Sequence, residues 1–328
     1  MERFKNVLGM RIDFNRMINI GILVALIIAA ALANRSFLSP GNLLGIIEQN
    51  AAKGVMALGI TFVLITGGID LSMENGLTMI AVVSSIFHVG WGNHAVTLVV
   101  LCILTGMALG AVNGFLITKL KLLPFVATLG MMSIAQGITH WASEGEIMFL
   151  SSEGVTFIGR GKVFGIISFQ IVVFVIMAAL AAVILYRTRL GTTIYALGSN
   201  EDAAAYSGIN TARQKFKVYV LNGAFVGVAA LLTVSRVGQI SPNLGSGSMM
   251  DAIAAAVIGG TSTLGGRGSI SGTILGVLII GVLVNALTFM NVPVNAQSAI
   301  KGLVILLAIV ADALLVSRRN MKLKEASA

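Results

Sequence analysis

Charged residues are scarce in this sequence. Only 11% of its 328 residues are charged, whereas 56% are hydrophobic. A soluble globular chain carries about 25% charged residues, because polar side chains must cover its surface. The scarcity excludes an ordinary soluble domain and indicates that lipid covers much of the apolar surface. The net charge of +9 is therefore interpreted as a topology signal and not as a nucleic-acid footprint.

Residues that commonly carry site chemistry are also few. The one cysteine, Cys102, lies within an apolar run, so no disulfide can form within the chain, and we predict a small packed side chain there. The three histidines, His88, His94 and His140, are scattered and show no metal-ligand spacing. No nucleophile–base pair or metal-ligand set lies within the apolar runs, so we expect neither a metal site nor an enzyme.

Linkers are missing as well. No proline- or serine-rich stretch, low-complexity tract or long run of charge divides the chain. Glycine, in contrast, is abundant at 38 residues, and it lets membrane helices approach closely. We predict a single transmembrane domain over residues 1–328.

Apolar runs long enough to cross a membrane recur along the whole chain. A spanning helix needs about 20 apolar residues. Ten candidate runs are present: 17–33, 43–66, 73–89, 95–116, 124–141, 166–186, 216–234, 250–260, 270–287 and 296–316. The eighth is short, so we expect a broken or tilted helix; the first is too long for a signal peptide. The predicted fold is an all-α polytopic transmembrane bundle of about ten spans.

Basic residues alternate between the loops of this arrangement. Ten spans with a cytoplasmic N-terminus place both termini inside, together with the loops after spans four, six and eight. Most of the 22 lysines and arginines then lie inside: Arg3, Lys5, Arg11, Arg16, Lys119, Lys121, Arg187, Arg189, Arg213, Lys215, Lys217, Arg267, Arg318, Arg319, Lys322 and Lys324. Trp91, Trp141 and Tyr186 fall at predicted span ends, where aromatic side chains favour the interface.

The longest predicted cytoplasmic loop, about 187–215, carries a short helix signal. Ser199 is followed three residues later by Asp202, a capping-box pattern, and Gly208 is a natural stop. A helix this short is not stable alone in water, so something must pack against it. It is either a connector resting on the membrane surface or a docking helix for a cytoplasmic partner.

Four motifs in order resemble ribose-type ABC sugar transporter permeases, within the branched-chain and monosaccharide permease superfamily. They are Gly67-Gly68-Ile69-Asp70-Leu71-Ser72; Asn113-Gly114 with the segment from Pro124 to Gly130; the segment from Tyr195 to Ile209; and the segment from Asp251 to Ser262 with Gly265-Gly266-Arg267-Gly268. The similarity extends from about residue 37 to residue 312. One departure is visible, because Met73-Glu74 follows Ser72 where the family has small residues.

The resemblance implies an importer in the bacterial cytoplasmic (inner) membrane. Two permease copies, expected as a homodimer, would form the pathway for a monosaccharide such as ribose. A separate ATP-binding cassette ATPase would use ATP-Mg, and an extracytoplasmic solute-binding protein would deliver the sugar. The residues expected to couple to the ATPase are Gly198, Ser199, Asn200, Glu201, Asp202, Ala203, Ala204, Ser207 and Gly208. The candidates for the pathway or its gate are Gly67, Gly68, Asp70, Ser72, Asn113, Asp251, Gly259 and Gly260.

Both glycine-rich motifs have a simpler physical interpretation. Glycines and a carboxylate at a span end favour an interrupted helix and a tight turn, which is tolerated at membrane depth only under a cover of protein or water. Close packing with Asp70 as a capping carboxylate is one alternative, and lining or gating the pathway is the other. We favour the cap for Asp70.

Polar residues inside the apolar runs are costly and therefore informative. Glu48 and Lys53 are five residues apart on one helix and should not pair with each other; with Gln49 and Asn50 they either snorkel outward or face the pathway mouth. We expect Lys301 to snorkel. Asn222 and Asn285 are expected to hydrogen-bond to neighbouring helices, with contact to sugar hydroxyls as the alternative.

Two other classes of function compete with the importer: a membrane-embedded enzyme, for which the apolar runs lack the nucleophile–base pair or metal-ligand set, and an ion-coupled secondary transporter. An ion-coupled secondary transporter of a small polar solute usually has a carboxylate near the membrane midplane. Asp70, Glu74 and Asp251 are all predicted near span ends, which argues against it. A phosphate-binding loop needs G-x-x-x-x-G-K-[ST], but Val163 follows the only Gly-Lys pair, Gly161-Lys162, so ATP hydrolysis is expected on another chain.

Overall fold

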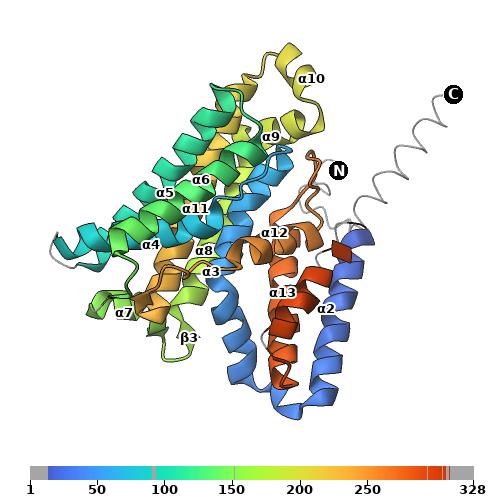
Figure 1. The fold of residues 1–328 in the computed structure, drawn as a ribbon. Coiled ribbons are helices and arrows are strands. Elements are labelled where there is room, and N and C mark those ends of the chain that lie inside the picture. The colour runs from blue at the N-terminus through green and yellow to red at the C-terminus, as the bar shows by residue number, and fades with distance from the viewer. Residues whose placement is uncertain are drawn as a thin grey trace.

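The structure is a computed structural model that describes residues 14–90, 94–150, 152–293, 295–304, 306–307 and 310, and it is built almost entirely of helices (Figure 1). The α-helices are α2 (Phe14–Ala33), α3 (Pro40–Ile65), α4 (Met73–Gly90), α5 (Ala95–Thr118), α6 (Pro124–Ser143), α7 (Glu153–Arg160), α8 (Phe169–Arg187), α9 (Arg189–Ser199), α10 (Glu201–Tyr206), α11 (Thr211–Val237), α12 (Ser248–Ile258) and α13 (Ile270–Phe289). Residues 295–304 are helical too. The remaining elements are a 3-10 helix, η1 (Arg35–Leu38), and four two-residue strands, β1 (Met148–Phe149), β2 (Lys162–Val163), β3 (Ile167–Ser168) and β4 (Gln239–Ile240).

The predicted all-α membrane class is confirmed. Within the described part of the chain, α5, α8, α11 and α13 are long and apolar enough to cross a bilayer, and 17–33 and α12 are shorter apolar helices. Each of the first nine predicted runs falls on one helix, α12 being as short as expected. The end of the tenth run, Trp91 and the basic residues of both termini other than Arg16, which lies in α2, are outside the described residues. The number of spans stays a prediction.

Helix α11 lies at the centre of the larger part of the bundle. Tyr219, Asn222 and Phe225 on it are fully or almost fully buried, and so is the second half of α3, from Val55 to Ile65. In contrast, only 28% of the apolar stretch of α5 and 22% of that of α8 are buried. The apolar faces left open on α5 and α8 are the surface that lipid would cover.

Helices α5 and α11 touch through their backbones. A Cβ atom on Gly106 would overlap the carbonyl oxygen of Gly223, and one on Gly110 would overlap that of Tyr219. Reciprocally, a Cβ atom on Gly227 would overlap the carbonyl oxygen of Cys102. Spacings of four residues between small side chains allow this approach in membrane helices. Some of the abundant glycines therefore let the antiparallel helices α5 and α11 pack backbone to backbone, without side chains between them.

A smaller group of helices, α2, α13 and the first half of α3, has its own core (Figure 1). The rings of Phe37 and Phe289 meet edge to face with centroids 5.8 Å apart. The amides of Asn42 and Asn285 donate to each other at 3.0 and 3.1 Å, which confirms the prediction that Asn285 bonds to a neighbouring helix. Asn19 also donates to the carbonyl of Ile258, at 2.6 Å.

Several short elements escaped the sequence analysis. Helix α7 and the hairpin of β2 and β3 fill the long connection before α8, and β1 pairs with β4 from the far end of α11, with Met148 opposite Ile240. Helix α9 precedes the short helix that was expected. Tyr186, predicted as an interface residue, also accepts a hydrogen bond from the Ile270 N–H at 3.0 Å. These elements have neither the length nor the periodicity of a spanning helix, so hydropathy alone does not reveal them.

Adding a methyl group between α5 and α11 should loosen the bundle. We expect Gly223→Ala to destabilise the protein by about 1–3 kcal/mol, because the new Cβ would overlap the Gly106 carbonyl and force the helices apart. Cys102 is the only cysteine and is fully buried beside this contact. The temperature at which it reacts with a thiol dye in detergent measures the effect. Gly21→Ala on α2, with nothing within 4 Å, is the control; an equal drop in both variants would contradict the prediction.

Candidate functional site

Three of the motifs noted in the sequence meet at one end of the bundle. The carbonyl of Ile65, at the end of α3, accepts a hydrogen bond from the Gly266 N–H at 2.9 Å. A Cβ atom on Gly198 of α9 would overlap that same carbonyl, and one on Gly265 would lie 2.9 Å from the Gly67 nitrogen. The Tyr195 hydroxyl donates to the carbonyl of Gly268 at 2.6 Å. The turn after α3, the loop between α12 and α13, and α9 thus form one junction, which we call the glycine junction.

Helix α10 projects from this junction (Figure 1). Asn200 caps it, because its side-chain oxygen accepts from the Ala203 N–H at 2.9 Å. The predicted capping role of Ser199 is wrong: Ser199 is the last residue of α9, and its hydroxyl donates to the carbonyl of Tyr195. A side-chain amide at the break between α9 and α10 replaces the capping box. The predicted stop at Gly208 is confirmed, since its φ is +82°.

Most of α10 is free of the rest of the chain. Ala204 packs inward, whereas Glu201, Asp202, Ala203, Ala205 and Tyr206 are exposed. Tyr206 as a whole is 93% exposed. Glu201 also forms an ion pair with Lys215 of α11 at 2.6 Å, which ties the helix to the start of α11. Of the residues predicted to couple to an ATPase, Gly198 and Ser199 therefore lie in the junction, and those from Asn200 to Gly208 form an exposed tip with one buried residue.

Asp70 lies in the turn after α3 and is 3% exposed. Its Oδ1 accepts from the Ser72 N–H at 3.0 Å and from the Ser72 hydroxyl at 2.6 Å, just before α4. Its Oδ2 accepts from the Asn222 amide at 2.8 Å, and the Asn113 amide donates to the Ser72 hydroxyl at 2.8 Å. Tyr219 adds a bond to the Ile69 carbonyl at 3.0 Å.

These bonds satisfy the buried carboxylate with donors from α5 and α11. A carboxylate held by this many donors needs no bound cation, and the residues that the structure describes contain no group of three metal-ligating side chains. Asp70 has a structural role, as expected, but it binds Ser72 in the turn before α4 and not an N–H of the first helical turn. Asn222 bonds to this turn, where a neighbouring helix was expected.

Asp251, on α12, is the centre of a second charged site. Its carboxylate is 4% exposed and is paired with Lys53 at 2.6 Å and with Lys301 at 2.9 Å. The prediction that Lys301 snorkels is wrong: its ammonium is paired with the buried Asp251 carboxylate inside the bundle. Lys53 and Glu48 do not pair, as expected; Lys53 turns instead to α12. Three segments distant in sequence are joined by these two ion pairs.

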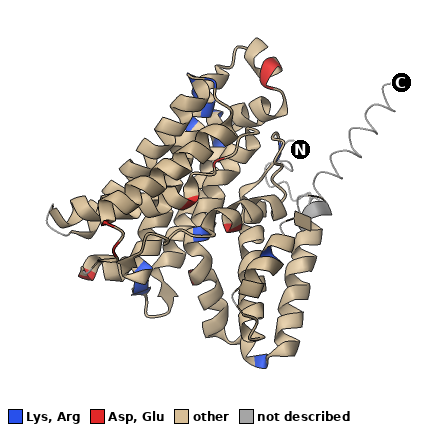
Figure 2. Ribbon diagram, viewed as in Figure 1, with Lys and Arg blue, Asp and Glu red and all other residues tan. Residues whose placement is uncertain are grey.

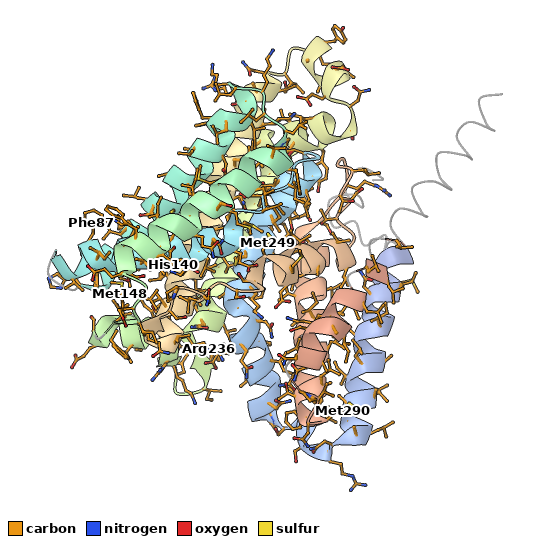
Figure 3. The ribbon with its side chains drawn as sticks, viewed as in Figure 1. Phe87, His140, Met148, Arg236, Met249 and Met290 are labelled. Carbon is orange, nitrogen blue, oxygen red and sulfur yellow. The ribbon has the colours of Figure 1, made fainter. Side chains whose placement is uncertain are left out.

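A cavity of about 330 Å³ opens beside this charged site. It lies between α3, α8, the end of α11 and the segment that leads into α12; Figure 3 labels Arg236 near the end of α11 and Met249 at the start of α12. Its lining mixes apolar and polar side chains: Gln49, Ala52, Lys53, Met56, Leu77, Gln170, Leu232, Thr233, Arg236, Val237, Leu244, Gly245, Ser246 and Ser248.

The residues predicted for the pathway do not line this cavity. Gly67, Gly68, Asp70, Ser72 and Asn113 lie in or beside the glycine junction. Gly259 packs on Gly272 of α13, Gly260 has a φ of +91° in the turn after α12, and Asp251 lies next to the cavity through Lys53. Their role in a pathway stays a prediction.

Sequence reasoning missed most of the polar lining. Gln49 and Lys53 were considered for the pathway mouth, but Gln170, Thr233 and Arg236 were not. Gln170 comes from the start of α8, and Thr233 and Arg236 come from the end of α11, so no local motif connects the two groups. The signal that could have found them is a polar side chain near the same end of several spans, which is informative only when the helices are already placed.

Comparisons with known proteins agree with the fold. Residues 42–309 match the family described as branched-chain amino acid transport system / permease component. The chain is 40% identical over 292 residues to the ribose import permease protein RbsC of Bacillus subtilis, covering 88% of this chain and 90% of the relative. It is 37% identical over 300 residues to RbsC of Escherichia coli K12, covering 88% and 92%.

A third relative is the galactose/methyl galactoside import permease protein MglC of Haemophilus influenzae, 34% identical over 317 residues that cover 91% of this chain and 93% of the relative. No solved structure matches. The resemblance seen in the sequence motifs is confirmed, and the matches extend over nearly the whole length of both partners. The chain is thus a multi-pass membrane permease and belongs to the branched-chain amino acid transport system / permease component family.

Proposed function

We propose that this chain forms the translocation pathway of an ATP-driven importer for a monosaccharide. The observation that carries the proposal is the glycine junction, which seats α9 directly on the ends of α3 and of the α12–α13 loop, while the exposed α10 projects from α9. A displacement of α10 by a cytoplasmic partner would reach these segments through backbone contacts, without a flexible linker between them. The relatives named as ribose and galactose import permeases support a sugar as the solute.

The partners follow from the same reasoning. Because this chain has no phosphate-binding loop, ATP-Mg would bind to a separate ATP-binding cassette ATPase that contacts α10. A solute-binding protein would dock at the opposite end, where the cavity opens. A second copy of the permease would complete the assembly as a homodimer in the cytoplasmic membrane of a bacterium. The chain itself would carry out no covalent chemistry.

The distribution of charge supports an orientation with α10 in the cytoplasm. Figure 2 shows lysines and arginines gathered where α5 ends and α11 begins, at the end of the bundle that carries α10. Eight basic residues lie after α5, where α8 meets α9, at the start of α11 and in the α12–α13 loop: Lys119, Lys121, Arg187, Arg189, Arg213, Lys215, Lys217 and Arg267. The opposite end has Arg35, Arg160, Lys162 and Arg236. The excess of positive charge favours the inside, and ten spans would then place both termini there.

Removing one aromatic side chain from α10 should weaken the ATPase complex. We expect Tyr206→Ala to reduce the amount of ATPase that copurifies with the permease by at least about fivefold, because exposed tyrosines at an interface often contribute 1 kcal/mol or more. Phe164, in the β2–β3 turn at the other end, is also 93% exposed. Phe164→Ala is the matched control and should leave copurification unchanged. Equal copurification with all three proteins would refute the role of α10.

Cysteine labelling should report the orientation directly. Cys102 is buried, so the wild-type protein should give little background with a membrane-impermeant maleimide. In spheroplasts that express the permease alone, Phe164→Cys should react from outside, and Tyr206→Cys should react only after the membrane is permeabilised. The reverse pattern would overturn the proposed orientation, and external labelling of both positions would overturn the spanning arrangement between them.

A further inference from the structure

The cavity beside α12 has the size of a site for one small solute. Its volume of about 330 Å³ corresponds to about eleven water molecules at about 30 Å³ each. Ligand sites in proteins run from about 300 to 1,000 Å³, so this one lies at the small end. It suits a single sugar ring better than a disaccharide.

Every ionisable residue in the lining is a cation. Lys53 and Arg236 border the cavity, and no carboxylate is among the described residues that line it. Arg236 donates one bond from Nη1 to the Gln49 carbonyl at 3.3 Å. A guanidinium has five N–H donors in a fixed fork, so this bond leaves most of the group available to a ligand.

Lys53 is not fully neutralised by its partner. Asp251 carries one negative charge, but both Lys53 and Lys301 are bound to it, so the three groups together have one excess positive charge. Lys301 lies away from the larger cavity and would keep Asp251 paired if Lys53 moved. Of the two lysines, only Lys53 lines this cavity; its side chain is 40% exposed, and that of Lys301 is 22% exposed.

The neutral polar side chains of the lining can accept hydrogen bonds from a ligand, whereas Lys53 and Arg236 can only donate them. Gln170 uses its amide to donate to the Leu232 carbonyl at 2.9 Å, and Thr233 donates to the Ala229 carbonyl at 2.7 Å. The Ser248 hydroxyl likewise donates to the Gly245 carbonyl. Each of these bonds uses a donor within the protein and leaves side-chain oxygen lone pairs that can accept a hydrogen bond from a ligand hydroxyl; the Gln170 amide also keeps a second N–H. They suit the hydroxyl groups of a sugar.

We propose that this cavity binds one monosaccharide acid, with its carboxylate on Lys53 and Arg236 and its hydroxyl groups on Gln170, Thr233 and Ser248. A carboxylate matches the fork of an arginine and forms stronger, charge-assisted hydrogen bonds than a neutral hydroxyl does. The inference rests on the proposed function as a sugar permease and names the class of sugar that the permease itself prefers.

A matched pair of sugars tests this preference. D-Glucuronate and D-glucose differ only in the carboxylate at C6. With the purified permease in detergent at constant ionic strength, we expect millimolar glucuronate to raise the temperature at which Cys102 becomes reactive by about 2–4 °C. Glucose should raise it by less than half as much, and acetate should not change it.

Substitutions of Lys53 and Arg236 test whether the glucuronate shift arises from binding in the cavity. Lys53→Gln and Arg236→Gln should each abolish most of the glucuronate shift, whereas Lys162→Gln, a lysine on β2 outside the cavity, should keep it. Equal shifts with glucose and glucuronate, no shift with either, an equal shift with acetate, or a shift retained in both cavity variants would each overturn the proposal. The wild-type comparison stands even if a variant fails to fold.

A failure of this proposal remains distinct from a failure of the proposed function. Copurification of the ATPase and labelling of the two engineered cysteines do not depend on the charge of the sugar. If those experiments succeed and glucose binds as well as glucuronate, only the preference for an acid is lost.

Discussion

The arrangement depends on a close approach of backbone to backbone at the carbonyl of Ile65. This one oxygen accepts the Gly266 N–H and lies against the Cα of Gly198, so the end of α3, the α12–α13 loop and α9 share a single point. Glycine at this position lets three segments of the chain come this near, because the Cβ atom of any other residue would occupy the space of the carbonyl. The position of α10 outside the bundle and the position of α12 inside it are both set by this contact.

Helix α3 connects the junction to the rest of the proposed pathway. Its last residue, Ile65, belongs to the junction, and Gln49, Lys53 and Met56 on its earlier turns border the cavity. From Met56 to Ile65 is about 14 Å along a helix at 1.5 Å per residue. The second half of α3 is fully buried, so this length is held firmly by neighbouring helices. The glycine junction and the cavity thus lie at two ends of one rigid element.

Much of this could be predicted from the sequence, for physical reasons. Hydropathy located nine helices, because burial in lipid requires long apolar runs, and Asp70 was expected to have a structural role because a carboxylate before a helix start has few other uses. The fate of Lys301 was not predictable, since its partner Asp251 is 50 residues away and only the folded bundle brings them within 2.9 Å. Ser199 was predicted as the cap from its spacing to Asp202, but Ser199 still belongs to α9 and the extended backbone of Asn200 makes that residue the cap of α10. The cavity lining could not be predicted for the same reason: its residues are distant in sequence and come together only when the helices have assembled.

The glycine contacts also determine where the bundle can change shape. Helices α5 and α11 interlock through Gly106, Gly110, Gly223 and Gly227, and α12 and α13 interlock through Gly259 and Gly272. Sliding within either pair would drive carbonyl oxygens into Cα atoms, so each pair behaves as a stiff body. The α12–α13 pair contacts α3 and the helix over 295–304 through side chains: the ion pairs of Asp251 with Lys53 and Lys301, and the amides of Asn42 and Asn285. Such contacts can be exchanged one at a time, so an alternating transport cycle would find its hinges there, with the α5–α11 pair as the stationary frame.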